Sequence, residues 1–177
     1  MRIIENIAEH IEQTDGIHGF FTGTFDPSHV GHVRALRDAI DTGKIDASII
    51  VLPHSVNPAK KPIDLATRRR WFAMNVQEFA SDLDEFVVIA GEEVHSPNQI
   101  GSLVERYKKR LLRISGSDKG IEGETQLRPG QREPGLSSSI IKQQIAQRNL
   151  DALKGKVAVK VLEEILQFDH YRNVSPS

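Results

Sequence analysis

The stretch GTFDPSHVGH, residues 23 to 32, combines residue types whose spacing could do chemistry. It follows an apolar run and holds two glycines together with His29 and His32. Glycine lets the backbone approach a ligand, and a helix starting near Val30 would present unpaired backbone N–H groups and its positive dipole end. Two imidazoles three residues apart would share one side of the first helical turn and could donate hydrogen bonds to phosphate oxygens. The stretch therefore indicates an anion site.

A metal site is the weaker interpretation of the same histidines. An HxxH pair needs a third ligand, the sequence has no HExxH context, and the chain contains no cysteine. We therefore predict no protein metal ligand. Asp26 is expected to cap or fix the turn, and a direct ligand role for it stays open.

The elements that must position this stretch alternate along the chain. Apolar runs predict strands at residues 17–23, 47–53, 86–91 and 111–117. Apolar periodicity predicts helices at residues 2–13, 30–42, 65–80, 100–110, 137–147 and 156–168, with Asp64 as an N-cap and Gly43 as a stop. Strands of unbroken apolar residues between helices are typical of a parallel sheet covered on both faces.

This order predicts an α/β fold: a doubly wound parallel sheet of about five strands or fewer in a single domain. We expect an N-terminal amphipathic helix over residues 1–15, the α/β domain over 16–170 and a tail over 171–177. Ligands in such sheets lie beyond the carboxyl ends of the strands. Three stretches fall at such ends: GTFDPSHVGH, PHSVNPAKKP after the second strand, and GSD after the fourth.

The composition limits the classes of binding partner expected for this protein. Lys and Arg total 23 against 24 Asp and Glu, so the formal net charge is -1 and favours neither nucleic acid nor a membrane surface. The basic runs at residues 68–70 and 106–113 are expected to be solvated helix faces, with Trp71 and Phe72 in the core. A chain without cysteine or a long apolar span fits a soluble cytoplasmic protein, and a homo-oligomer stays open.

GTFDPSHVGH resembles the signature of the HxGH nucleotidyltransferase superfamily, and within it most closely that of the nicotinate or nicotinamide mononucleotide adenylyltransferases. LSSSIIK, residues 136 to 142, resembles the second element of that superfamily, often written I-S-S-T-x-I-R, with Lys142 at the arginine position. Two elements roughly a hundred residues apart, both at expected helix starts, are more specific than either alone. LPHSVNPAKKP and SGSD are similar to the family's N-P-P-H-K loop and G-A-D segment.

The resemblance implies a Rossmann-like nucleotidyltransferase fold and transfer of AMP from ATP to a phosphomonoester, with pyridine mononucleotides as the first choice. The implied catalytic residues are His29, His32 and Lys61. The implied ATP contacts are Gly23, Thr24, Phe25, Gly31, Lys60, Gly116, Asp118, Ser138, Ser139 and Lys142. Which of Lys60 and Lys61 contacts the ligand stays open, and Mg²⁺ is expected to bind through the ATP phosphates and water.

The acceptor is left open by the sequence. NPAKKP and SSSIIK equally resemble elements of the pantetheine-phosphate adenylyltransferases, whose R-G-L-R is missing here, so that activity or another HxGH cytidylyl- or adenylyltransferase activity is the alternative. Residues 119–135, KGIEGETQLRPGQREPG, contain no aromatic residue, whereas mononucleotide adenylyltransferases carry a tryptophan in a longer segment there. A nucleotide-binding protein with a reduced acceptor pocket, acting as a sensor or subunit, is therefore the alternative from another functional class.

Overall fold

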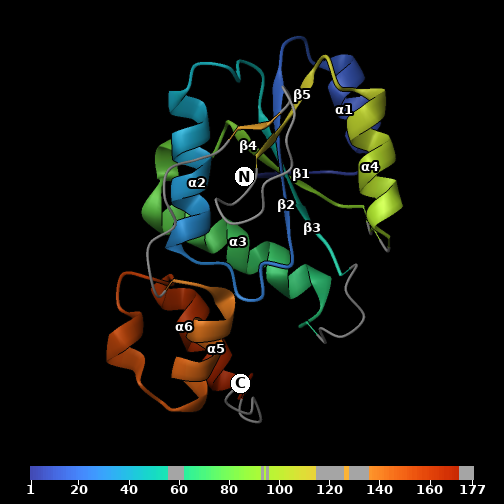
Figure 1. Cartoon of the computed structure of the whole chain (residues 1–177). Coiled ribbons are helices and arrows are strands. Elements are labelled where there is room, and N and C mark those ends of the chain that lie inside the picture. Colours follow the sequence, from blue (N-terminus) through green and yellow to red (C-terminus); the bar gives the residue numbers. More distant parts are fainter. Residues whose placement is uncertain (56–61, 93, 95, 115–125, 128–135, 172–177) are drawn as a thin grey trace.

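The structure is a computed structural model that describes residues 1–55, 62–92, 94, 96–114, 126–127 and 136–171. Its centre is a 6-stranded sheet with the strand order β1-β4-β3-β2-β5-β6 (Figure 1). Every neighbouring pair is parallel. The strands are β1 (Arg2–Ile4), β2 (His18–Gly23), β3 (Ile49–Pro53), β4 (Val87–Ala90), β5 (Leu111–Ile114) and β6 (Gln126–Leu127).

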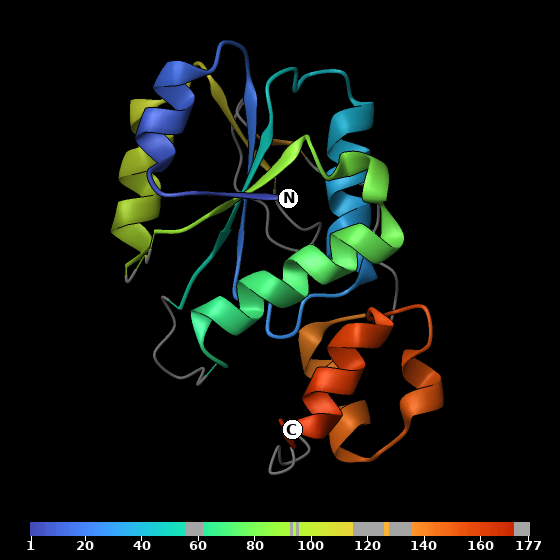
Figure 2. The same cartoon turned by 180° about the vertical axis from the view of Figure 1, so that it is seen from behind.

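The helices are α1 (Ile7–Gln13), α2 (Val30–Asp41), α3 (Leu65–Phe79), α4 (Pro97–Arg106), α5 (Ser138–Ala146) and α6 (Val159–Gln167), with short 3₁₀ turns η1 (Ser81–Leu83) and η2 (Leu150–Leu153). The first four cover both faces of the sheet. Figures 1 and 2 show α2 and α3 on one face and α1 and α4 on the other.

Alternating side chains of each strand supply the two cores. In β3, Ile49 and Val51 pack toward the α2 and α3 face, and Ile50 and Leu52 toward the α1 and α4 face. The predicted doubly wound α/β fold is thus confirmed.

The last two helices lie below the carboxyl edge of the sheet and have their own core (Figure 1). That core joins α5 and α6 to Val30 of α2 and to Trp71 of α3. Trp71 and Phe72 are each 0% exposed, which confirms that both are core residues. The Trp71 indole N–H donates to Glu164 Oε2 at 2.9 Å and ties α3 to α6.

The predicted helix over residues 2–13 is wrong in its first turn. Residues Arg2 to Ile4 form the edge strand β1, paired with Val88 to Ala90 of β4, and α1 begins only at Ile7. The neighbouring β-branched residues Ile3 and Ile4 favour an extended backbone. Pairing with β4 also satisfies the backbone N–H and C=O groups of this segment. The sheet accordingly has six strands instead of the expected five or fewer, with β1 and β6 as the short strands that were not predicted.

Local capping explains where the other helices begin. Asp64 Oδ1 accepts from the Thr67 N–H at 2.9 Å, so the predicted N-cap of α3 is confirmed. Helix α4 begins at Pro97, three residues before the predicted start, because Ser96 and Gln99 form a capping box. Gly43, with φ of 67°, follows the end of α2 as predicted.

Candidate functional site

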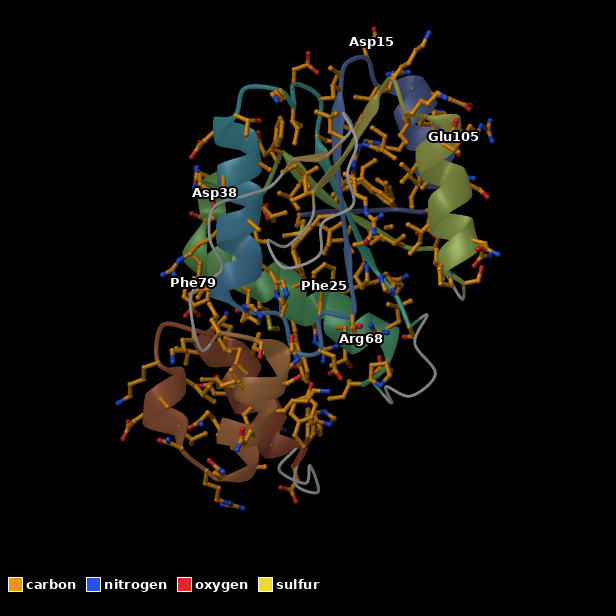
Figure 3. The ribbon with its side chains drawn as sticks, viewed as in Figure 1. Asp15, Phe25, Asp38, Arg68, Phe79 and Glu105 are labelled. Carbon is orange, nitrogen blue, oxygen red and sulfur yellow. The ribbon has the colours of Figure 1, made fainter. Side chains whose placement is uncertain are left out.

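The turn after β2 lies at the carboxyl edge of the sheet, as predicted. It contains a cis Asp26–Pro27 peptide bond and Phe25 with φ of 49°. A left-handed backbone is unfavourable for a bulky residue and persists only where surrounding contacts hold it. Phe25, labelled in Figure 3, is 3% exposed, and its ring packs edge-on against Phe72 with ring centroids 4.9 Å apart. The side chain of Phe25 is therefore part of the core, and only its backbone could contact a ligand.

The two histidines form one stacked unit at the start of α2. Their ring centroids are 3.8 Å apart with an interplanar angle of 28°. The backbone N–H of His29, the N-cap residue, donates to His32 Nδ1 at 3.2 Å, which places the proton of a neutral His32 ring on Nε2. Phe25 supports the His32 ring edge-on, with centroids 4.9 Å apart. The imidazoles are thus fixed by packing before any ligand arrives.

Not every N–H of the first helical turn is available for an anion. The Val30 N–H donates to the Lys156 carbonyl at 2.8 Å, and the His32 N–H donates to the His29 carbonyl at 2.9 Å. The α2 start therefore differs from a bare helix end, because the chain before α6 takes one of its donors. The anion interpretation consequently rests on the imidazoles and on the rest of the turn.

Gly31 is required by close packing of this turn. A Cβ added to Gly31 would lie 2.9 Å from Leu136 Cδ2 and 3.1 Å from His29 Cε1 and Nδ1. Leu136 is the first residue of the second sequence element, so the missing side chain lets the two elements approach each other. Gly31 was expected to let the backbone approach a ligand, and that role stays a prediction; the close approach in the structure is to Leu136 and the His29 ring.

The second element docks directly on the first. Ser138, the first residue of α5, donates from Oγ to the Pro27 carbonyl at 2.8 Å. One turn later, Lys142 Nζ lies 2.5 Å from Asp26 Oδ2. The α5 helix start therefore lies against the cis turn, although 111 residues separate Pro27 from Ser138.

Asp26 is the centre of a small buried network. The side chain is 2% exposed, and it accepts from Lys142 through Oδ2 and from the Tyr171 hydroxyl through Oδ1. Burial raises the pKa of the Tyr171 phenol above its usual range, and the negative charge of Asp26 raises it further. These contacts are structural, as favoured for Asp26 from the sequence.

Arg68 holds the loops that follow β2 and β3. The prediction that residues 68–70 form a solvated face is therefore wrong for Arg68, which is buried. Arg68 is 2% exposed and donates to the carbonyls of Thr24 and His54 at 2.7 and 2.9 Å. Its pKa is lowered by desolvation, while the charge of Asp26 opposes that shift. Arg69 also turns inward and donates to the Gly91 carbonyl at 2.7 Å. Backbone carbonyls at three strand ends need donors, which the sequence pattern does not reveal.

A second connector, Asn75 of α3, was not identified from the sequence. It is 0% exposed and donates to Ser28 Oγ at 2.9 Å. Its Oδ1 accepts from the Ala158 N–H at 2.9 Å, at the start of α6. Asn75 therefore joins α3 to the C-terminal helices and to residues 23–32, which we call the histidine turn. A buried amide on an otherwise apolar helix face is the signal that could have found it.

Four of the expected contact residues, Lys60, Lys61, Gly116 and Asp118, lie outside the described residues. The described ones all lie at the carboxyl edge of the sheet or at the α5 start: Gly23, Thr24, Phe25, His29, Gly31, His32, Ser138, Ser139 and Lys142. Ser139 is exposed, whereas Ser137 caps α5 by accepting from the Ile140 N–H at 3.2 Å. Within the described ranges, no group of three or more His, Asp or Glu side chains could hold a metal ion.

A doubly wound parallel sheet with an HxGH turn after a central strand, facing a serine-capped helix, is the arrangement expected of the HxGH nucleotidyltransferase superfamily. A family model described as cytidylyltransferase-like matches residues 20–118, more than half of the chain. The protein belongs to this cytidylyltransferase-like family.

Two curated relatives show sequence similarity. The "Probable nicotinate-nucleotide adenylyltransferase" of Sulfurimonas denitrificans is 30% identical over 101 residues, which cover 55% of this chain and 54% of that protein. The chain thus matches about half the length of this relative. The FAD synthase of Ferroglobus placidus is 29% identical over 121 residues, 68% of this chain and 72% of that protein.

Solved structures show the same fold. Plasmodium falciparum nicotinic acid mononucleotide adenylyltransferase complexed with NaAD has a TM-score of 0.69 at 11% identity, covering 89% of this chain and 98% of that chain. The same enzyme complexed with APC has a TM-score of 0.67 at 12% identity and equal coverage. These identities establish the fold alone. In the part of the chain that the structure describes, no helix has the length and apolar character to cross a membrane.

Proposed function

We propose that the protein is an adenylyltransferase that transfers AMP from ATP to a small phosphomonoester and releases pyrophosphate. Its preferred acceptor is nicotinate or nicotinamide mononucleotide, so the reaction belongs to NAD biosynthesis. The observation that carries the proposal is the docking of the α5 start on the histidine turn, through Ser138 and Lys142. Two helix starts that meet at one place can contact the phosphates of a single triphosphate.

The proposed reaction needs no protein nucleophile. An oxygen of the acceptor phosphate forms a bond to the α-phosphorus of ATP, and the bond from that phosphorus to the pyrophosphate breaks. Catalysis then consists of alignment and of donors placed where negative charge grows. This requirement fits a chain without cysteine, in which two packed imidazoles and a lysine lie at one edge of the sheet.

In this proposal, His29 and His32 meet the α and β phosphates together with the backbone N–H groups of Thr24 and Phe25. Ser138, Ser139 and Lys142 meet the β and γ phosphates from the α5 start. Lys142 would share its charge between Asp26 and the triphosphate, because the carboxylate already holds the ammonium beside the turn. Lys60 or Lys61, and Gly116 with Asp118, complete the proposed nucleotide contacts.

We propose that Mg²⁺ binds together with the nucleotide. The one carboxylate of the histidine turn, Asp26, is engaged by Lys142 and Tyr171, so the described site offers no acidic ligand set. The ion is therefore expected on the phosphate oxygens and water, where it would neutralise part of the phosphate charge. We further expect the enzyme to act in the cytoplasm, since the chain has no cysteine that would call for an oxidising compartment.

Pyrophosphate release tests the donor and the acceptor together. The purified protein is incubated with Mg²⁺, with ATP or CTP, and with one acceptor at a time: nicotinate mononucleotide, nicotinamide mononucleotide, FMN, 4′-phosphopantetheine, or a sugar or choline phosphate. We expect release with ATP and a pyridine mononucleotide, and a dinucleotide product by mass spectrometry. Binding of ATP without release for any acceptor would favour the sensor or subunit alternative.

Adenylyl transfer to FMN is the second candidate. It is supported by the similarity to the Ferroglobus placidus FAD synthase, which extends over 68% of this chain. FMN also presents a phosphomonoester, so the same phosphate contacts would serve. A higher kcat/KM with FMN than with either pyridine mononucleotide, and FAD as the product, would establish this candidate over the first.

A further inference from the structure

The chain turns back toward the site after α6. Asp169 and Tyr171 have left-handed backbones, with φ of 53° and 70°. Such conformations are unfavourable for residues with a side chain and persist where contacts hold them. The His170 N–H donates to the Ile165 carbonyl at 2.9 Å, and the His170 ring meets Trp71 edge-on with centroids 5.6 Å apart. This turn brings Tyr171 to the edge of the sheet where the histidine turn lies.

Tyr171 contacts both charged members of the network at the α5 start. Its hydroxyl donates to Asp26 Oδ1, and its ring lies beneath the Lys142 ammonium, with Nζ 4.8 Å from the ring centroid. Lys142 in turn contacts Asp26 Oδ2. Three elements distant in sequence therefore meet around one ammonium group: the histidine turn, α5 and the segment after α6.

The two oxygens of the Asp26 carboxylate have different partners. One carboxylate oxygen is taken by Tyr171 and the other by Lys142, so the phenol fixes the carboxylate that holds the ammonium. A lysine side chain has several rotatable bonds and loses entropy when it is held in one position. A ring face attracts the ammonium without neutralising it, so the charge remains available to a phosphate.

We infer that Tyr171 is a positioning residue for Lys142: together with Asp26 it holds the ammonium at the α5 start, where it binds the outer phosphates of the nucleotide. This inference rests on the proposed function for the identity of the ligand. It adds a residue from the C-terminal segment to the nucleotide site. Tyr171 acts through Lys142 and has no contact with the reacting atoms.

A double-mutant cycle on nucleotide affinity tests the inference. Tyr171→Leu is expected to weaken binding of the non-hydrolysable analogue β,γ-imido-ATP roughly five- to twentyfold, the range given by loss of a partly desolvated cation–π contact. AMP affinity should stay unchanged, because AMP lacks the outer phosphates. In a Lys142→Met background, Tyr171→Leu should have no further effect. An equal loss in that background would show a general structural role and overturn the inference.

Two variants separate the hydroxyl and the ring from general effects of the C-terminal segment. Tyr171→Phe keeps the ring and removes the hydrogen bond to Asp26, so its loss of affinity should be smaller than that of Tyr171→Leu. Phe168 is 59% exposed on the same segment, and Phe168→Leu should leave β,γ-imido-ATP affinity unchanged. A loss with Phe168→Leu as large as with Tyr171→Leu would contradict the inference.

Amine reactivity tests the positioning without any nucleotide. Under brief acetylation followed by mass spectrometry, Lys142, whose side chain is 23% exposed, should react more slowly than Lys154, which is 80% exposed. Tyr171→Leu should bring the Lys142 rate toward that of Lys154, and an unchanged ratio would overturn the inference. If the parent protein bound no ATP, the proposed function would fail, and this ratio would still decide whether Tyr171 positions Lys142.

Discussion

His32 is held from two sides at the start of α2. Its ring stacks on His29 and meets the edge of Phe25, while Nδ1 accepts the His29 N–H. A donor that is fixed before the ligand arrives needs no reorganisation when charge develops on the phosphates. This geometry makes His32 the residue with the clearest expected effect on turnover.

Replacing His32 by alanine should lower kcat about 10²- to 10³-fold, the usual effect of losing one transition-state donor. The unfolding midpoint and the circular dichroism spectrum should remain close to those of the parent. His32→Gln, whose amide can take the place of Nε2 as an N–H donor, should recover part of the loss. Equal steady-state rates for His32→Ala and the parent would remove this histidine from the mechanism.

Gly31→Ala should disturb the same turn by overpacking. The added Cβ would lie 2.9 Å from Leu136 Cδ2 and 3.1 Å from the His29 ring, so one of them must move. An overpacking cost of about 1 to 3 kcal/mol is partly offset by about 0.5 to 1 kcal/mol from removing a helical glycine, so we expect a net loss of up to about 2.5 kcal/mol in the free energy of unfolding, together with weaker ATP binding. Urea denaturation and calorimetric titration measure the two effects.

Gly101→Ala is the matched control for that variant. Gly101 lies in α4, and a Cβ there would meet nothing within 4 Å. Removing a glycine from a helix interior should stabilise the protein by about 0.5 to 1 kcal/mol and leave ATP binding unchanged. A destabilisation equal to that of Gly31→Ala would contradict the packing explanation.

At the scale of elements, polar side chains of α3 hold the site together. Arg68 fixes the loops after β2 and β3, and Asn75 joins the histidine turn to the start of α6. Buried donors and acceptors of this kind are costly to leave unpaired, so one residue can control the placement of two elements.

Asn75→Leu should lower the free energy of unfolding by about 2 to 4 kcal/mol, because the Ala158 N–H and the Ser28 hydroxyl would lose a buried partner. Nucleotide affinity should fall with it, since Ser28 precedes His29. Urea denaturation gives the first quantity. Asn98→Leu on the exposed surface of α4 is the control and should stay within about 0.5 kcal/mol of the parent.

At the scale of the whole molecule, a second polar cluster lies at the amino ends of the strands, opposite the candidate site. Ser48 Oγ lies 3.1 Å from His10 Nε2 and 2.9 Å from His18 Nδ1. His18 Nε2 donates to the Thr14 carbonyl, and the Arg2 guanidinium faces His10 Nδ1. The chain of donors and acceptors is complete when both rings are neutral, and a proton added to His10 Nδ1 would face the Arg2 guanidinium.

Burial lowers the pKa of both histidines, with further lowering by His18 and Arg2 for His10, and by Arg110 for His18. The Thr14 carbonyl and Asp46 oppose the shift at His18. In the unfolded chain a histidine has a pKa near 6.5. As the pH falls below this value, the unfolded state therefore binds protons that the native state does not bind. The contribution to stability is thus complete above that pH and is lost as the pH falls toward the native pKa values.

The free energy of unfolding should therefore fall between pH 7.5 and 5.5, with a slope of at most about 2.7 kcal/mol per pH unit for two histidines. Urea denaturation across this range measures the slope. His18→Gln removes one titrating group and should reduce the slope while lowering stability at neutral pH. A parent protein whose stability is constant across this range would refute the assignment.

The sequence by itself determined the order of the main strands and helices, since apolar runs, helical periodicity, the Asp64 cap and the Gly43 stop are local signals. It also placed His29, His32 and Ser138 at helix starts. The parts missed are those that depend on pairing between distant residues.

Only the tertiary structure decided that residues Arg2 to Ile4 form an edge strand and that Arg68 and Asn75 turn inward. It alone brought Tyr171 onto Asp26 and Lys142. A buried polar side chain takes its partner from whichever backbone or charged group the packed chain brings within hydrogen-bond distance. No local periodicity or capping signal encodes that distance, so these contacts became visible only when the elements were packed together.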